Sequence, residues 1–135
     1  MLTDTGPLVA LLDRDDAQHS DCLAALARLP RGPLRTTWPC FTEATYMLDR
    51  VGGYRYQNSL WHWRRDGRLL LLEVSAAETD RMDTLMKQYQ SVPMDLSDSS
   101  LVAVAESRGI RRLFTIDSDF YIYRLADGSI LDVVR

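Results

Sequence analysis

Short apolar segments alternate along this chain with longer helical segments, and this alternation limits the folds that it can adopt. The residue pattern predicts strands at residues 1–4, 34–38, 69–74, 113–116 and 130–134. It predicts helices at residues 7–12, 16–29, 54–66, 76–90 and 97–108, with a further helix that begins at Pro39 and is ended by Gly52 and Gly53. Strands joined through helices form right-handed crossovers. We therefore expect an α/β fold, a three-layer sandwich with a central, mostly parallel sheet.

Three details of this pattern bear on how the elements pack and where they end. The segment 69–74 is almost continuously apolar, which is typical of a strand covered on both faces. In the helix predicted at 54–66, Tyr56, Leu60 and Trp63 recur at helical spacing and form a packing stripe. Gly109 is expected to end the helix at 97–108 in a left-handed conformation.

The length and composition of the chain exclude several classes of protein. Its 135 residues are expected to form one domain, residues 1–135, with 46% hydrophobic and 26% charged side chains as in globular proteins. The longest apolar runs, 8–12 and 101–105, are five residues each, so no membrane span is expected. Two cysteines and the absence of an apolar leader at the start of the sequence favour the cytoplasm.

The basic residues of the chain exclude several catalytic mechanisms. The net charge is −3, and the cations are fifteen arginines and a single lysine, Lys87. No Gly-Lys-Ser/Thr sequence occurs, so a phosphate-binding loop of the P-loop type is excluded. Mechanisms that need a lysine at a strand end are excluded in the same way.

Acidic residues follow two of the predicted strands. Asp4 ends the first strand, and Asp117 and Asp119 follow the strand at 113–116. In an open parallel sheet, binding sites lie beyond the carboxyl ends of the strands. For each of these residues taken alone, a role as a helix cap or a turn former is favoured over a functional one.

Two further acids lie near the starts of predicted helices. Asp98 has Leu101, Val102 and Ala105 at positions i+3, i+4 and i+7, which places its carboxylate on the buried stripe. An exposed acid in a first helical turn remains an equal alternative. Glu43 stands at the edge of an apolar stripe in the helix that begins at Pro39, where it complements the helix dipole.

Four converging carboxylates would need a cation between them. Two carboxylates about 4 Å apart repel by about 4 kcal/mol at an effective dielectric constant near 20. A site made only of carboxylates, with no histidine or cysteine, is suited to Mg²⁺ or to Mn²⁺ rather than to zinc. The sequence therefore indicates a magnesium site if these acids meet.

Four segments of the chain together resemble the PIN domains, and most closely the bacterial toxin ribonucleases of the VapC kind. They are LTDTGPLVALLD at 2–13, TEATYML at 42–48, MDLSDSSL at 94–101 and TIDSDF at 115–120. The resemblance covers nearly the whole chain, from Asp4 to Phe120. It departs from the usual pattern at Ser99, where an alanine is common.

The resemblance implies a Mg²⁺-dependent endoribonuclease, usually a homodimer, that is inhibited by a cognate antitoxin. Asp4, Glu43, Asp98 and Asp117 match the catalytic acids of the family, and Asp4, Asp98, Asp117 and Asp119 match its metal ligands. Thr5 and Thr115 match hydroxyl positions beside the metal. Asp95 is a rival of Asp98 for its metal position, although the helical register favours Asp98.

The surface that would bind RNA is less defined by the sequence. Arginine side chains near the acidic segments and in the aromatic, basic segment 54–68 are candidates for phosphate contacts: Arg14, Arg50, Arg64 and Arg65. A different class of function is also open. A catalytically silent PIN-like module that binds RNA or protein would have the same fold with purely structural acids.

Overall fold

The computed structural model describes residues 1–135 and contains a five-stranded sheet in the order β3-β2-β1-β4-β5. The strands are β1 (Leu2–Thr3), β2 (Leu34–Thr37), β3 (Leu69–Leu72), β4 (Arg112–Phe114) and β5 (Asp132–Val134). All four strand pairs are parallel, which confirms the predicted sheet. Because β1 lies between β2 and β4, the chain winds away from β1 in both directions.

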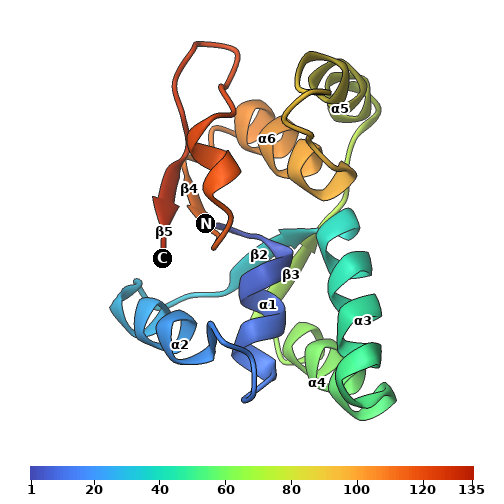
Figure 1. The fold of residues 1–135 in the computed structure, drawn as a ribbon, viewed down its shortest axis with the longest axis vertical. Helices are drawn as coiled ribbons and strands as arrows, with labels where there is room; N and C mark the ends of the chain where they lie inside the picture. Colours follow the sequence, from blue (N-terminus) through green and yellow to red (C-terminus); the bar gives the residue numbers. More distant parts are fainter.

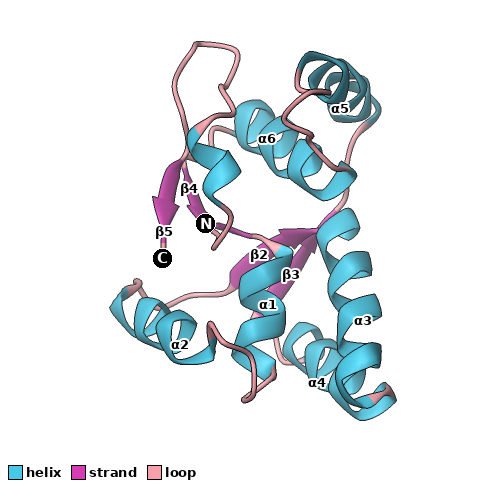
Figure 2. Ribbon diagram, viewed as in Figure 1, coloured by secondary structure: helices cyan, strands magenta, loops and turns pink.

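Helices cover both faces of this sheet (Figures 1 and 2). They are α1 (Thr5–Leu12), α2 (His19–Arg28), α3 (Trp38–Gly52), α4 (Tyr54–Arg65), α5 (Ala76–Gln88) and α6 (Leu96–Arg108), and a short 3-10 helix, η1, spans Ser118–Tyr121. Helices α5 and α6 pack beside β4 and β5 in the upper part of the view, whereas α1 to α4 lie around β2 and β3 below (Figure 1). None of these helices is both long and apolar enough to cross a lipid bilayer.

The core consists of two hydrophobic clusters, one on each face of the sheet. Successive residues of β4 point to opposite faces, so Leu113 joins the cluster under α5 and α6 and Phe114 joins the cluster under α1, α3 and α4. Leu60 is fully buried and Tyr56 and Trp63 pack against the second cluster, which confirms the stripe predicted in this helix. The three-layer sandwich is therefore confirmed.

The prediction that residues 69–74 form a strand covered on both faces is wrong. β3 lies at the edge of the sheet and ends at Leu72, and the side chain of Leu70 is 39% exposed. A run of leucines indicates a strand but contains no information about the position of that strand in the sheet.

Four helices begin at other residues than predicted: α3 and α6 each begin one residue earlier, and the larger differences, at α1 and α2, involve aspartate side chains that bind the backbone near the helix start. α1 begins at Thr5 rather than Pro7, since the Asp4 carboxylate accepts a hydrogen bond from the Thr5 amide at 2.7 Å. α2 begins at His19 rather than at residue 16, since the Asp16 carboxylate accepts a hydrogen bond from the Gln18 amide at 2.8 Å. The helix after residue 97 ends as predicted, with Gly109 at φ 66°.

A buried ion pair connects α5 to α6. Glu78 is only 3% exposed, and its carboxylate accepts hydrogen bonds from Arg108 at 3.0 and 3.1 Å. It also accepts a bond from the Ser75 amide at 2.9 Å in the capping box of α5. The Arg108 guanidinium and these bonds lower the pKa of Glu78 from 4.5 to about 2.

We expect Glu78→Gln to lower the free energy of unfolding by about 1.5–3 kcal/mol at pH 7, because the charged hydrogen bonds between Glu78 and the partly exposed Arg108 are lost. The folded-state pKa of Glu78 lies below its unfolded value, so its contribution is present above pH 4.5 and is lost as the pH falls through about 2. Urea unfolding at pH 7 and pH 3 measures this difference, which should be smaller at pH 3. Asp83→Asn, at an exposed position of the same helix, is the control and should change little.

Candidate active site

Asp4 lies where the carboxyl ends of β1 and β4 meet, at the point where the chain winds in both directions. Its amide donates a hydrogen bond to the Phe114 carbonyl at 2.9 Å, which fixes it beside β4. One carboxylate oxygen accepts the bond from Thr5, and the other accepts a bond from the Thr115 hydroxyl at 2.8 Å. The side chain is only 7% exposed. Asp4 is thus a nearly buried carboxylate held by two donors.

The turn after β4 brings Asp117 and Asp119 to the same edge of the sheet. The Asp117 amide donates to the Thr115 hydroxyl at 3.0 Å, so Thr115 connects this turn to Asp4. The Asp117 carboxylate caps η1 by accepting a bond from the Asp119 amide at 2.9 Å. The Arg135 guanidinium donates to the Ile116 carbonyl at 3.1 Å and supports the turn from β5.

The structure distinguishes between Asp95 and Asp98 at the start of α6. Asp95 is exposed and caps the helix by accepting a hydrogen bond from the Asp98 amide at 2.8 Å. Asp98 is 6% exposed, as the helical register predicts, and it accepts a bond from the Tyr123 hydroxyl at 3.2 Å. Asp98 therefore belongs to the buried acidic group, and Asp95 lies at its border.

Burial and the charges of neighbouring carboxylates raise the pKa values of Asp4 and Asp98. The pKa of Asp4 rises from 3.8 to about 6, mainly through loss of solvent and also through the charges of Asp117 and Asp95. The pKa of Asp98 rises to about 8, again mainly through burial, with contributions from Asp95, Asp4 and Asp117. Burial and the charge of Asp98 also raise the pKa of the Tyr123 hydroxyl. The site therefore holds more negative charge than it can stabilise alone.

We expect Thr115→Val to raise the pKa of Asp4 further above 6. The Thr115 hydroxyl donates its hydrogen bond to the charged form of Asp4, and a bond of this kind lowers a carboxyl pKa. Valine has nearly the same shape and no hydroxyl. A carbon-detected NMR titration of the Asp4 carboxyl measures the shift, and an unchanged pKa would contradict the assigned bond. Thr84→Val, the same substitution at an exposed position of α5, is the matched control.

Glu43 does not share hydrogen bonds with the other acids. It is half-buried on α3 and lines a groove of about 540 Å³ between α3 and the start of α6, together with Ser97, the neighbour of Asp98. The structure thus places the four predicted catalytic acids at one end of the sheet. The charge of Asp117 raises the pKa of both Asp4 and Asp98, and Glu43 lines the adjoining groove.

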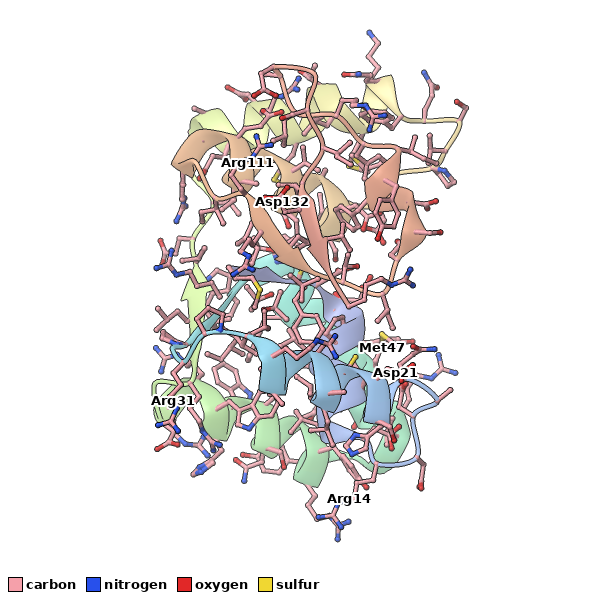
Figure 3. All side chains as sticks on the ribbon, turned by 90° about the vertical axis from the view of Figure 1, so that its left-hand side faces the viewer. Arg14, Asp21, Arg31, Met47, Arg111 and Asp132 are labelled. Atoms are coloured by element: carbon pink, nitrogen blue, oxygen red, sulfur yellow. The ribbon has the colours of Figure 1, made fainter.

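The predicted substrate-binding residues are more scattered. The Thr5 hydroxyl is buried and donates to the Cys40 carbonyl at 3.4 Å, and Thr115 bonds Asp4, so both support the acids. Arg14 lies beyond the far end of α1, which is about 12 Å long, and it projects outward at the lower end of Figure 3. The structure does not bring Arg14 to the acids, because α1 leads away from Asp4.

The other three arginines surround grooves rather than the acids. The Arg50 guanidinium lies 5.8 Å from the centre of the Tyr46 ring, beside the groove that contains Glu43. Arg64 and Arg65 line a second groove of about 370 Å³ along β3. Trp38 lines both grooves.

Sequence reasoning missed two residues that support the site. Tyr123 bonds Asp98, and Arg135 bonds the turn of Asp117. Both come from segments that follow η1, where no periodic pattern indicates which side chains turn inward. Their contacts arise from tertiary packing alone.

The acids fit a hard divalent cation by their chemistry. No three carboxylate, imidazole or thiol groups stand together as a complete metal-binding cluster. Mg²⁺ does not require one, since it commonly keeps several waters and binds through one or two carboxylates. The oxygen-only donors and the raised pKa values of Asp4 and Asp98 match a site where a cation offsets the repulsion.

Comparisons with known proteins agree with this geometry. The family model of the PIN domain matches residues 1–126. A search of curated proteins found no significant match.

Several solved structures share the fold. The structure of VapC20 from Mycobacterium tuberculosis, described as a sarcin-ricin loop cleaving toxin, has a TM-score of 0.82 at 21% identity, over 90% of this chain and 92% of that one. VapBC2 from Rickettsia felis, bound to a DNA fragment from its promoter, has a TM-score of 0.67 at 15% identity, over 99% and 98%. A toxin–antitoxin complex from Klebsiella pneumoniae has a TM-score of 0.65 at 18% identity, over 88% of each chain.

Proposed function

The chain belongs to the PIN domain family, and from this premise we propose that it is a Mg²⁺-dependent endoribonuclease, the toxin of a toxin–antitoxin pair. One observation carries the proposal: Asp4, Asp98 and Asp117 come from three separate parts of the chain, and burial together with neighbouring carboxylates, Asp117 among them, raises the pKa values of Asp4 and Asp98. A structural role alone does not account for an uncompensated group of buried acids, because unpaired burial of charge is costly.

In this proposal Asp4, Asp98 and Asp117 hold a Mg²⁺ ion, with Asp119 as an accessory ligand; Mn²⁺ is the alternative ion. When bound, such an ion polarises phosphodiester oxygens and lowers the pKa of water. The chain's own donors keep the carboxylates in place: Thr115 orients Asp4 and Tyr123 orients Asp98. Support of this kind determines the direction in which a ligand oxygen points.

Glu43 is the proposed general base. It has no hydrogen-bond partner in the protein and lies in the groove next to Ser97, so its carboxylate is free to orient and deprotonate an attacking water. Replacing Glu43 with glutamine keeps its size and removes this basicity. We expect RNA cleavage by Glu43→Gln to fall about 10²- to 10⁴-fold.

The proposed partners are an RNA substrate, a cognate antitoxin protein and a second copy of the chain. Solved structures with the same fold include toxin–antitoxin complexes from Klebsiella pneumoniae and Rickettsia felis, which supports an antitoxin partner. Co-purification with the product of an adjacent short reading frame would test this part of the proposal.

The activity itself is tested by incubating the purified chain with total cellular RNA in Mg²⁺ and, separately, in EDTA. The proposal predicts discrete cleavage products in Mg²⁺ only, and their loss with Glu43→Gln purified in the same way. Products that persist in EDTA or with Glu43→Gln would contradict it. Binding of RNA without cleavage would favour the catalytically silent module.

A further inference from the structure

The groove between α3 and α6, which we call the Trp38 groove, exposes large aromatic side chains. It is lined by Trp38, Thr42, Glu43 and Tyr46 of α3 and by Leu96 and Ser97 of α6. Trp38 is 41% exposed, Tyr46 is 64% exposed and Leu96 is 54% exposed. Large rings are thus open to solvent directly beside the acidic site.

Trp38 is held in a fixed orientation although much of its ring is exposed. Its indole packs edge-on against Phe41 with 5.7 Å between ring centres, and Phe41 packs in turn against Trp61 at 4.8 Å. Phe41 is almost fully buried. The core therefore positions the indole, and its remaining surface is a rigid flat platform.

The groove adjoins the acidic residues of the candidate active site. Its inner end contains Glu43 and Ser97, and Ser97 precedes Asp98 in α6. The Arg50 guanidinium lies beside the groove, 5.8 Å from the centre of the Tyr46 ring that lines it, with Arg50 Nη1 at 3.5 Å from the Tyr46 hydroxyl. A strand of nucleic acid that leaves the acids along α3 would meet an aromatic platform first and a cation next.

We propose that the Trp38 groove binds an unpaired base of the RNA substrate, next to the phosphate that is cleaved, by stacking it on Trp38. The inference rests on the proposed nuclease function and specifies how that site selects single-stranded RNA. Stacking on aromatic rings with arginine contacts to the backbone is the common way in which proteins bind single strands. A base in a duplex is already stacked and cannot enter such a groove.

Glu43 disfavours a protein surface over the groove, and the Arg50 guanidinium beside Tyr46 supplies the positive charge that attracts a phosphate. Cores of protein interfaces are depleted of charged residues. A protein seated over the groove would remove water from the Glu43 carboxylate, which has no partner in this chain, and such burial is costly. A single strand leaves the groove hydrated and Glu43 accessible.

The test measures RNA binding in Mg²⁺, with Glu43→Gln as the common background of all variants, so that the acids are neutralised and binding does not depend on cleavage. A fluorescein-labelled, ten-nucleotide single-stranded RNA of mixed sequence is titrated by anisotropy, and quenching of tryptophan fluorescence is followed with the unlabelled RNA. We expect Trp38→Ala to weaken binding about 5- to 150-fold, the range for loss of one stacked base. Trp38→Phe should keep most of the affinity and lose the quenching.

Two further variants test the groove even if Trp38→Ala does not fold. Tyr46→Ala changes a more exposed ring in the same groove and should also weaken binding. Tyr54→Ala, at an exposed tyrosine outside the groove, should leave the affinity unchanged. On the RNA side, an abasic site at the stacked nucleotide should weaken binding to the Glu43→Gln chain but not to its Trp38→Ala variant.

Several results would overturn the inference. These are unchanged affinity in both Trp38→Ala and Tyr46→Ala, quenching that persists in Trp38→Phe, or no saturable binding of the RNA. Self-association of the chain that depends on Trp38 and Tyr46, with RNA affinity unchanged, would assign the groove to a second copy instead. Failure of the nuclease proposal would be recognised separately, as Trp38-dependent binding together with no cleavage in Mg²⁺ by the chain that retains Glu43.

Discussion

Asp4→Asn is expected to make the metal-free protein more stable at pH 8 and, at the same time, to lower RNA cleavage by about two to four orders of magnitude. The activity loss corresponds to several kcal/mol of transition-state stabilisation by the cation that Asp4 would help to hold. The stability gain has a separate cause. Asp4 is nearly buried among like charges, and its charged form is unfavourable in the folded chain.

The pH dependence of this gain follows from the direction of the pKa shift. The pKa of Asp4 is about 6 in the folded chain and 3.8 without the fold's influence. The folded state therefore keeps a proton that the unfolded state loses, and stability falls as the pH rises from 3.8 through 6. Above pH 6 the penalty is complete, about 3 kcal/mol for a shift of this size. Asparagine avoids it while retaining an acceptor for the Thr5 amide.

Thermal melting in EDTA at pH 5 and pH 8, together with the cleavage assay, measures both effects. The variant should gain stability over the wild type at pH 8 and gain less at pH 5. Asp83→Asn, an exposed acid on α5, controls for a general effect of removing negative charge. A variant that is less stable than the wild type at pH 8, or that still cleaves RNA normally, would refute this assignment of Asp4.

The second large effect is expected from a pair of substitutions at the start of α6. Asp98→Asn should lower cleavage by about 10²- to 10⁴-fold, for the same reason as Asp4→Asn. Asp95→Asn should keep most of the activity, since asparagine caps a helix as well as aspartate does. Each substitution removes one negative charge, and the two positions are three residues apart. A difference between the cleavage activities of the two variants therefore shows which of the two carboxylates the reaction needs.

Stability measurements separate these two acids in a second way. The pKa of Asp98 is about 8 in the folded chain, so the wild type loses stability as the pH rises from 3.8 through 8. In EDTA, Asp98→Asn should therefore stabilise the chain most at pH 9 and least near pH 4. Greater loss with Asp95→Asn would show that Asp95 is the metal ligand, and equal cleavage by the two variants would contradict the assignment of Asp98.

The sequence predicted the fold and most of the acidic site because both depend on local patterns. Strand ends placed Asp4 and Asp117 at one edge of a parallel sheet, and helical spacing placed Asp98 on a buried stripe. The structure confirms both placements.

Features that depend on the packing of distant segments could not be predicted. The edge position of β3 follows from strand order, which a run of leucines does not encode. The contact of Tyr123 with Asp98 follows from the path of the chain after η1. The distance of Arg14 from the acids follows from the direction of α1. The Trp38 groove is formed by two helices far apart in the sequence.

The net charge of −3 is a poor guide to the partner of this chain for the same reason. Several of the acids are collected at one edge of the sheet, where they repel one another. Arg50, Arg64 and Arg65 lie apart from these acids, along the grooves beside α3 and β3. Charge must therefore be judged locally, and the local arrangement suits a cation at the acids and an anionic strand beside them.

The claim that these acids hold a divalent cation is tested most directly by thermal melting of the wild type and of Asp4→Asn over a range of Mg²⁺ concentrations at pH 8. A ligand that binds only the folded state adds about 2.7 kcal/mol of stability at one hundred times its dissociation constant. The melting temperature of the wild type should rise with Mg²⁺, and that of Asp4→Asn should not. Equal shifts in the two proteins, or no shift in the wild type, would contradict the metal site on which the proposed function depends.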